Sequence, residues 1–575
     1  MPADGPALIE HSQTRRSRRH FVRAGLLSAV GLVLSAACSA RQDAADQPSD
    51  AVKPTEGQQS ARAASRKSDT TKKPAEIAPS TAQADSGTTP ATDAPKRGGT
   101  LRVGLAVDAF TLDPHLSGGK TDRQVMHNVY EPLVTLGEKL DVKPGLAESW
   151  QQTDPRTIMF KLRRGVRFHD GTEFNAQAAK LNFDRMQNPD TKSVRRGEIA
   201  NVENAEVVDA FTLKLNLKRP DAALLAALSD CAGMMVSPAA VQKFGPDLQR
   251  NPVGTGPFQF TEWAKDDHLS LARFDDYWDK AAGPYLDQIR YRPIPDDSVK
   301  AQSLRAGELD AIDYVAPREE ATLRGDAGVE VIDVPSLASF AYQLNVRKPP
   351  FDRKPLRQAL ANAIDTGAIT RSVWLGLGVP SNGPIAPSSW AYDAAMKPIA
   401  RDVAKAKALL SEGGMPDGYA FACTVNNVPA NIQEAEAMKA QLTEVGIRLE
   451  ITPTDAAILL ANGNAGQFDM IAYQWSGRPD PDGNTYQFFK TAQGPSLNWA
   501  GYSNAKVDEL LGKSREASDR TERTRLYGEL GRALQDDVPW LFVIHPTEPK
   551  AFSPKVRGYA PVPDGVIRLK DVWLA

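Results

Sequence analysis

Several short motifs carry residue types that catalytic or metal sites use, and each departs from its motif. Gly119-Lys120-Thr121 ends like a phosphate-binding P-loop, but that loop needs a glycine where Pro114 stands. The run Asp480-Pro481-Asp482-Gly483-Asn484 partly matches a calcium loop, yet it lacks the third alternating oxygen ligand and the terminal glutamate. The sequence therefore predicts no ATP site at the first motif and a polar turn at the second.

Nucleophile and zinc motifs are also missing. The 7 histidines show no zinc-protease spacing, no Cys-x-x-Cys pair occurs, and no Gly-x-Ser-x-Gly nucleophile elbow is present. We therefore expect no enzyme, no cofactor and no resident metal.

Composition bounds the class of protein. The 575 residues are 41% hydrophobic and 24% charged, and the net charge is -2, without a basic stripe of interleaved aromatics. Nucleic acid is therefore not an expected partner. Of the 3 cysteines, Cys231 and Cys423 lie far apart in sequence and either pair or remain buried thiols.

The N-terminal segment reads as an export signal. Arg18-Arg19 precede an uncharged, mostly apolar run over 24–37, which is the twin-arginine pattern and is shorter than the roughly 20 residues that a membrane-spanning helix needs. Small residues before Cys38 resemble a lipoprotein processing site, although Leu34 stands one place further from the cysteine than usual. We predict lipidation of Cys38, with ordinary cleavage and an incidental cysteine as the alternative.

Residues 39–95 form a low-complexity linker. From Arg41 to Pro95 the chain has no aromatic residue and almost nothing large and apolar. Such a segment cannot bury enough surface to offset its ordering entropy. We expect a disordered spacer, which after a lipidated cysteine would hold a folded domain near the membrane; a plain secreted linker is the alternative.

The remaining chain, 96–575, is globular and long enough for two or more lobes. Apolar alternation predicts strands over 101–105, 158–162, 213–217 and 447–451, and helical spacing predicts helices over 176–186, 403–410 and 431–445. Mixed strands and helices along the whole chain indicate an α/β class.

Six groups of residues, taken in order, resemble the extracytoplasmic solute-binding proteins, family 5, of peptide, nickel and related ABC importers. The groups are 96–103 with 111–115, 130–133, 145–150, 162–172, 254–258 and 345–351. Within them, Trp150 and Phe168 read as core residues and the glycines as turns.

The resemblance implies a two-lobed periplasmic-binding-protein-like fold, of the large class with an inserted subdomain in lobe I. Lobe I would comprise 96–336 and 545–575, and lobe II 337–544, with ligand trapped between lobes that close about a hinge. We also expect a monomer, periplasmic or at the cell surface and tethered by lipid on Cys38, that delivers a solute to permease subunits served by separate ATPase subunits.

The resemblance predicts that one charged residue of the cleft, Arg478, determines the class of ligand. In peptide binders, the segment similar to 473–477 is followed by an aspartate that pairs with the ligand ammonium, and here that position is Arg478. An arginine favours a ligand with a carboxylate or phosphate. The alternative is that Arg478 only braces its loop through Asp480 or Asp482. In dipeptide binders an arginine for the ligand carboxylate precedes the helix similar to 431–445, and no basic residue occurs here from Thr424 to Gln433.

The resemblance implies further cleft residues with less force. They are Trp475, Ser476 and Gly477 beside Arg478, Gly118 and Lys120 in a loop of lobe I, Trp390 after a proline-rich stretch, and His545 on the second crossing segment. For Trp475 and His545 the alternative is packing, and for Lys120 it is solvation.

Three functions remain open at this point. The favoured one is a capture receptor for a small peptide-like or other anionic-group-bearing solute. The second is an exported hydrolase of peptides or glycoconjugates, for which no nucleophile or metal set is recognisable. The third is a surface lipoprotein with an adhesion or chaperone role.

Overall fold

A computed structural model describes residues 94–281, 283–492 and 496–575. The predicted signal, Cys38 and the linker up to residue 93 lie outside the described residues. Within them, no helix is long and apolar enough to cross a membrane.

Lobe I is built on a mixed sheet. Its seven strands among the described residues are, in spatial order, β12 (Glu330–Ile332), β19 (Lys550–Phe552), β11 (Ala311–Ile312), β1 (Thr100–Leu105), β10 (Gln288–Pro293), β9 (His268–Arg273) and β8 (Phe258–Ala264). Strand β1 runs parallel to β10 and β11, and its residues Leu101, Val103 and Leu105 are buried, as the alternation predicts. Helices α1 (Lys120–Val129), α5 (Asp297–Arg305) and α6 (Pro317–Arg324) belong to this lobe.

The inserted subdomain lies between β1 and β8 in the chain. An antiparallel sheet orders β4 (Ala147–Asp154), β5 (Thr157–Leu162), β7 (Thr212–Leu217) and β6 (Val202–Asp209), and a hairpin pairs β2 (Val134–Leu136) with β3 (Val142–Pro144). Its helices are α2 (Ala176–Gln187), α3 (Leu224–Ala227) and α4 (Pro238–Phe244). Helix α2 begins where predicted, because the Asn175 side chain accepts a hydrogen bond from the Ala178 amide.

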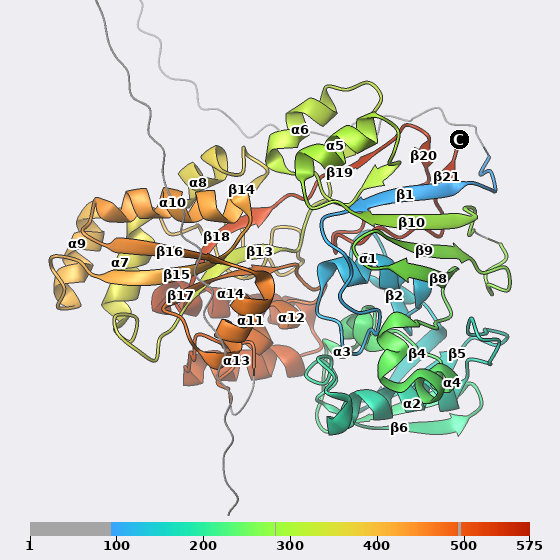
Figure 1. Cartoon of the computed structure of the whole chain (residues 1–575). Helices are drawn as coiled ribbons and strands as arrows, with labels where there is room; N and C mark the ends of the chain where they lie inside the picture. The colour runs from blue at the N-terminus through green and yellow to red at the C-terminus, as the bar shows by residue number, and fades with distance from the viewer. Residues whose placement is uncertain (1–93, 282, 493–495) are drawn as a thin grey trace, which may run out of the picture. The chain divides into compact units, whose positions relative to one another are not determined.

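Lobe II holds a second mixed sheet. Its spatial order is β14 (Gly378–Pro380), β18 (Trp540–Pro546), β13 (Ser339–Leu344), β17 (Met470–Trp475), β15 (Ala420–Asn426) and β16 (Arg448–Thr454). The predicted helix-to-strand unit is confirmed, with the helix two residues earlier: α10 (Pro429–Thr443) lies along β15 and β16 (Figure 1). The other helices are α7 (Lys354–Ala363), α8 (Thr366–Ser372), α9 (Val403–Glu412), α11 (Ala456–Ala465), α12 (Asp482–Phe489), α13 (Ala505–Glu516) and α14 (Arg520–Asp537).

Two crossing segments connect the lobes. The first, 333–338, leads from β12 to β13, and the second, 547–549, leads from β18 back to β19. The break expected after residue 336 falls inside the first segment. The break expected after 544 comes too early, because Ile544, His545 and Pro546 still pair with β14 in the lobe II sheet.

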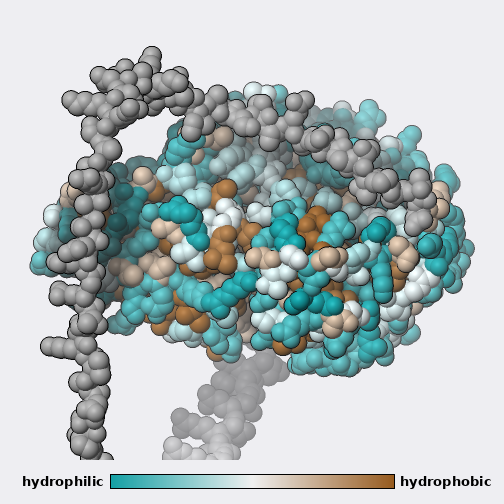
Figure 2. All heavy atoms as spheres, turned by 90° about the horizontal axis from the view of Figure 1, so that it is seen from above, coloured by the Kyte–Doolittle hydropathy of each residue, from teal (hydrophilic) through white to brown (hydrophobic). Residues whose placement is uncertain are grey.

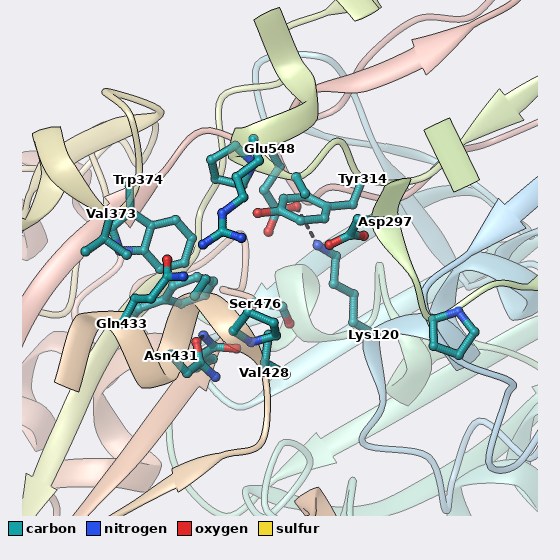
Figure 3. Close-up of a pocket in the computed structure, with 18 of the residues that line it drawn as sticks. Lys120, Asp297, Tyr314, Val373, Trp374, Val428, Asn431, Gln433, Ser476 and Glu548 are labelled. Carbon is teal, nitrogen blue, oxygen red and sulfur yellow. Dashed lines mark hydrogen bonds and ion pairs between the residues drawn. The ribbon is translucent and has the colours of Figure 1, made fainter. Parts of the chain in front are cut away.

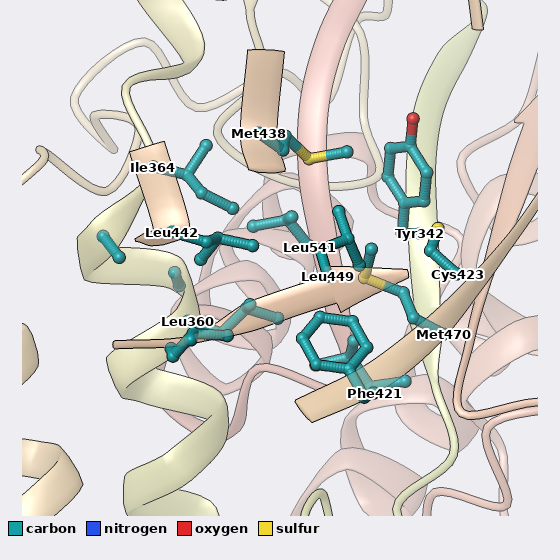
Figure 4. Packing of buried hydrophobic residues seen from close by; sticks show 14 of the residues in the cluster. Tyr342, Leu360, Ile364, Phe421, Cys423, Met438, Leu442, Leu449, Met470 and Leu541 are labelled. Atoms are coloured by element: carbon teal, nitrogen blue, oxygen red, sulfur yellow. The ribbon is translucent and has the colours of Figure 1, made fainter. Parts of the chain in front are cut away.

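Separate cores stabilise the lobes and the inserted subdomain. In lobe II, Leu360 of α7 and Met438 and Leu442 of α10 pack with Phe421 and Leu541 of the sheet (Figure 4). Phe168 is fully buried in the core of the subdomain, as predicted. Each core removes contiguous apolar surface from water, the dominant favourable term in folding.

The visible exterior is largely hydrophilic, and the two described cysteines are buried. Hydrophilic side chains predominate on the face shown in Figure 2, with apolar ones scattered between them. Cys231 lies in lobe I and Cys423 in lobe II, and both are buried free thiols. Of the two alternatives for these cysteines, the unpaired one is correct.

Candidate functional site

A cavity of about 660 Å³ opens between the lobes. This volume lies within the range of small-molecule sites, roughly 300–1,000 Å³. Lobe I contributes Gly118, Lys120, 295–298, Tyr314 and 316–319, and Glu548 joins them after the second crossing. Lobe II contributes Phe340, Val373, Trp374, 428–431, Gln433, Leu460 and 473–476. We call this space the main cavity (Figure 3).

Charge in the main cavity is divided between its two walls. The described charged residues that line it, among them Lys120, Arg318 and Glu548, come from lobe I and the returning chain. The lining residues from lobe II are apolar, aromatic or uncharged polar. The Lys120 ammonium lies 2.7 Å from Glu548 Oε2 (Figure 3). Burial alone would raise the pKa of Glu548, but Lys120 and Lys550 hold it below its ordinary value. A ligand here meets ionic groups on one side and an uncharged, partly aromatic surface on the other.

Trp374 forms part of the apolar wall and is fixed from behind. Its indole Nε1 donates to Glu434 Oε2 at 2.6 Å, and the Tyr342 hydroxyl donates to Oε1 of the same carboxyl at 2.8 Å. Burial raises the pKa of Glu434 to about 7, although both hydrogen bonds oppose the shift. Sequence reasoning missed Trp374 and Glu434, because nothing in their local pattern distinguishes them from core residues.

Trp475 and Ser476 line the main cavity, as the resemblance implies. The Trp475 indole donates to Asn484 Oδ1 at 2.8 Å, and its ring packs against Tyr473 and Phe488. The ring is therefore held rigidly at the cavity edge.

Position 477, beside the cavity, requires glycine because of its backbone conformation and close packing. Its φ is +81°, and a Cβ there would lie 2.3 Å from the Leu337 carbonyl oxygen. The chain after β17 therefore approaches the first crossing segment more closely than any larger residue allows.

Arg478 does not line the main cavity in this conformation. Its guanidinium stacks on the Trp475 ring, with 4.2 Å between Cζ and the ring centroid, and Nη1 donates to the Gly477 carbonyl at 2.8 Å. The side chain borders a second cavity of about 800 Å³ between the inserted subdomain and lobe II. The direction of the guanidinium thus differs from what the resemblance implied.

The loop brace given as the alternative role of Arg478 does not form, because both acids have other partners. Asp480 binds Arg523 of α14, and Asp482 binds Arg515 of α13. The Arg478 Nε lies 3.8 Å from Oδ2 of Asp230, in lobe I, and has no hydrogen-bond partner among the described residues. Burial, followed by the nearby Arg123, lowers the pKa of Arg478.

Asp230 is the centre of a buried charge cluster that joins the lobes. It accepts hydrogen bonds from Arg123 Nε and His127 Nε2, each at 3.1 Å, besides its contact with Arg478. Burial would raise the pKa of Asp230, but Arg123, His127 and Arg478 hold it well below its usual range. Nearby, the Ala222 amide donates to the Arg515 carbonyl at 2.8 Å, a second contact between the lobes.

Trp390 and His545 lie away from the main cavity. Trp390 packs against Tyr527, with Arg520 and Arg523 over its ring. His545 lies within β18 instead of on the crossing, and its ring nitrogens contact the Ser381 hydroxyl at 2.9 Å and the Ala338 carbonyl at 3.0 Å. Burial lowers the pKa of His545 to about 4, so the ring is neutral. In this conformation both residues pack instead of lining the cavity.

No metal site is evident in the part of the chain that the structure describes. No group of three or more His, Cys, Asp or Glu side chains there could hold a metal ion. The two acids of the calcium-like motif, Asp480 and Asp482, form ion pairs with Arg523 and Arg515 instead.

Comparison with known proteins decides the family. Residues 141–496 match the family described as bacterial extracellular solute-binding proteins, family 5. The chain belongs to this family.

Similar proteins of the family match most of this chain and share its fold. The glutathione-binding protein GsiB of Salmonella choleraesuis is 33% identical over 482 residues, covering 82% of this chain and 94% of that protein. The periplasmic binding protein DppA of Helicobacter pylori, solved with the peptide STSA, has a TM-score of 0.77 and 27% identity, covering 83% and 98% of the two chains. AgaA of A. tumefaciens R10, solved with agropinic acid, has a TM-score of 0.76 and 26% identity, covering 83% and 99%.

Family membership confirms the two-lobed α/β fold and the capture-receptor class of the favoured function. The protein is a substrate-binding component of an ABC importer, and the members of its family act outside the cytoplasm. These relatives are binding proteins, which does not favour the hydrolase alternative.

Proposed function

We propose that this family 5 protein captures a peptide-like solute with at least one anionic group and delivers it to a membrane permease. The observation that carries the proposal is Arg478, a buried cation whose Nε has no hydrogen-bond partner among the described residues. The Asp230 carboxylate beside it, 3.8 Å from Nε, is shared with Arg123 and His127. A buried charge that is incompletely paired is costly, and a ligand carboxylate or phosphate would satisfy it.

The named ligands of similar proteins fit this chemistry. Glutathione, the peptide STSA and agropinic acid are the molecules named for the three relatives. We propose glutathione as the first ligand to test, together with any molecule that mass spectrometry finds copurifying with the protein.

Calorimetry of ligand binding tests the role of Arg478. Arg478→Ala should weaken binding about a hundredfold, because a hydrogen bond to a charged group contributes about 1.5–3 kcal/mol and each 1.4 kcal/mol is tenfold. Arg478→Asp should weaken it further through repulsion.

Arg196→Ala is the matched control. Arg196 lines the same second cavity but is exposed, so its removal should change the affinity little. If Arg478→Ala binds the copurifying ligand as tightly as the parent does, or if that ligand has no anionic group, Arg478 is only a structural residue.

We further propose that the protein is a monomer exported by a twin-arginine signal and tethered through lipid on Cys38. The small residues before Cys38 and the polar linker after it support the tether. Cys38→Ser should move the protein from the membrane fraction to the soluble extracytoplasmic fraction. Unchanged fractionation with a mature N-terminus elsewhere would contradict the tether.

Ligand should also close the two lobes about the crossing segments. Small-angle scattering is expected to give a smaller radius of gyration with saturating ligand, as differential affinity shifts the population towards the closed state. An unchanged curve with verified binding would indicate a rigid receptor.

A further inference from the structure

Glu434 of α10 is a buried carboxylate without a cationic partner. It is 4% exposed, and among the described residues no cation lies near enough to affect its pKa. Its oxygens accept from two neutral donors instead, Oε2 from Trp374 Nε1 at 2.6 Å and Oε1 from the Tyr342 hydroxyl at 2.8 Å. A glutamate is rarely buried unless it is paired, because burying its charge is costly. The position of Glu434 therefore points to a role in holding these two donors.

Trp374 needs such an acceptor, because it lies on a turn. The turn follows α8 and is outside the helices and strands, and the next two residues, Leu375 and Gly376, have φ of +50° and +85°. No strand ladder or helix therefore holds the Trp374 backbone. The indole N–H can only donate, and when its acceptor is removed a buried donor is left unsatisfied. The hydrogen bond to Glu434 is thus the polar anchor of this ring.

Trp374 in turn supports Phe340, which lines the main cavity with it. The centroids of the two rings are 5.3 Å apart, and the ring planes are inclined by 52°. Phe340 and Tyr342 are two residues apart on β13, so their side chains lie on the same face of the sheet. Figure 3 shows Trp374 beside Val373 in the wall of the cavity. Glu434 therefore connects two residues of one strand face to the turn after α8.

We propose that Glu434 is a positioning residue for ligand capture, which fixes Trp374 and, through Trp374, the Phe340 part of the main cavity wall. Glu434 acts from the core side and does not itself line the cavity. A wall that is ordered before the ligand arrives reduces the entropy that is lost on binding. The inference rests on the proposed function in assigning the main cavity to the ligand.

The two donors also decide which oxygen of Glu434 takes up a proton. Burial raises the pKa of Glu434 to about 7, although both hydrogen bonds oppose the shift. Trp374 Nε1 only donates, so Oε2 must remain an acceptor, whereas the Tyr342 hydroxyl can donate or accept. The proton therefore goes to Oε1 and is donated to the Tyr342 oxygen. Trp374 is held in both protonation states.

Other groups around Glu434 do not titrate in the same range. Burial raises the pKa of Tyr342 and of Cys423, the two described titratable groups that face Glu434, well above their ordinary values. Helices α7 and α8 also contact α10, but no described charged side chain of either affects the pKa of Glu434. A signal from Trp374 that changes near pH 7 would therefore report the protonation of Glu434.

Calorimetry with reduced glutathione and with the peptide Ser-Thr-Ser-Ala compares three variants. Glu434→Gln keeps an oxygen for Trp374 and offers its amide group to the Tyr342 oxygen, so its affinity should stay within about threefold of the parent. Glu434→Met has no acceptor and should bind about tenfold or more weakly, because the ligand must then immobilise two side chains. Tyr342→Phe is the matched control. It removes the other hydrogen bond of the same carboxyl, and its affinity should stay within about threefold of the parent.

NMR of the indole N–H groups tests the positioning without a ligand. The Trp374 signal is identified by its absence in Trp374→Phe. In the parent and in Glu434→Gln it should be shifted downfield and exchange slowly, and Glu434→Met should lose both properties. The shift should titrate near pH 7 in the parent and stay constant in Glu434→Gln.

Trp374→Phe provides a second route, because it loses the same hydrogen bond while the carboxyl is kept. It should weaken binding as Glu434→Met does, and it serves the same test if Glu434→Met does not fold. Trp374→Phe combined with Glu434→Met should bind about as tightly as the weaker single variant, because both changes remove one contact. Additive losses would overturn the positioning role.

The outcomes separate the two proposals. If the parent binds neither probe, the proposed function fails for both, and the role of Glu434 in capturing them fails with it. If the parent binds a probe and Glu434→Met binds it as tightly, or if Tyr342→Phe weakens binding as much as Glu434→Met, only the positioning role is overturned. A Trp374 indole signal that is the same in the parent and in Glu434→Met would also overturn it.

Discussion

Replacing Asp230 by asparagine should destabilise the protein more than most buried polar substitutions. The change keeps the shape but removes the one carboxylate that Arg123, His127 and Arg478 share. Arg123 would retain only Asp564, at 3.9 Å. Removing one partner of a buried ion pair costs about 3–5 kcal/mol, because the remaining charge is left uncompensated. That is a large part of the roughly 5–15 kcal/mol by which proteins are stable.

Urea unfolding followed by circular dichroism and tryptophan fluorescence measures the loss. Asp221→Asn is the matched control, since Asp221 is buried nearby but bonds Asn201 and the Ala223 amide instead of an arginine at hydrogen-bond distance. Burial raises the pKa of Asp221 to about 6, so a neutral side chain there should cost about 1 kcal/mol or less.

The pH dependence and a second substitution sharpen the test. Because the pKa of Asp230 is depressed in the folded protein, its contribution is full above the ordinary value of about 3.9 and is lost as the pH falls through the folded pKa. The difference in the free energy of unfolding between parent and variant should thus be constant from about pH 5 to 8 and should narrow in stronger acid.

Adding Arg478→Met to the variant should recover about 1–3 kcal/mol, because it removes one unpaired cation. If Asp230→Asn lies within about 1 kcal/mol of the parent at pH 7, or if the second change recovers nothing, the cluster does not act through charge compensation.

Three further outcomes are expected. Burial raises the pKa of Glu131 to about 7, so its contribution to stability is full below about pH 4.5 and is lost as the pH rises through 7. Glu131→Gln should therefore make the melting temperature less dependent on pH between these values. An unchanged slope of melting temperature against pH would contradict the shift. Gly477→Ala should lower the stability measured by thermal unfolding by about 1–3 kcal/mol, through backbone strain and its clash with Leu337. Gly512→Ala, in α13 with open space at its Cβ, should raise the stability by about 0.5–1 kcal/mol. Equal effects of the two substitutions would refute the close approach at Gly477. Burial raises the pKa of Cys231 to about 12 and that of Cys423 well above its ordinary value. In a Cys38→Ser background, neither thiol should therefore react with Ellman's reagent before the protein unfolds. Rapid reaction of the native protein would disprove their burial.

Local pattern and motif order were enough to predict the architecture. The alternation in β1 and β5, the Asn175 cap of α2 and the helix before β16 all depend on residues close in sequence, and the structure confirms them. The same order of motifs implied two lobes with a cleft near Gly118, Lys120, Trp475 and Ser476, which line the main cavity.

Tertiary packing decided how the side chains of the cleft are used. Asp480 and Asp482 were plausible partners for Arg478 by sequence distance, but Arg523 and Arg515 bind them, and Arg478 turns onto Trp475 towards Asp230. Ion pairs form between groups that burial brings together, and sequence proximity does not determine that choice.

The same limit applies to the residues that sequence reasoning missed. Glu434 holds Trp374 in place from the core side, and Asn431 Oδ1 accepts a hydrogen bond from Gln474. His545 has the residue type of a cleft ligand, yet Ser381 and Ala338 already occupy both of its ring nitrogens. Local patterns and the order of the motifs were enough to predict the fold, the family resemblance and the segments of the cleft. They could not predict which polar groups remain unpaired there, because that depends on partners far apart in the chain.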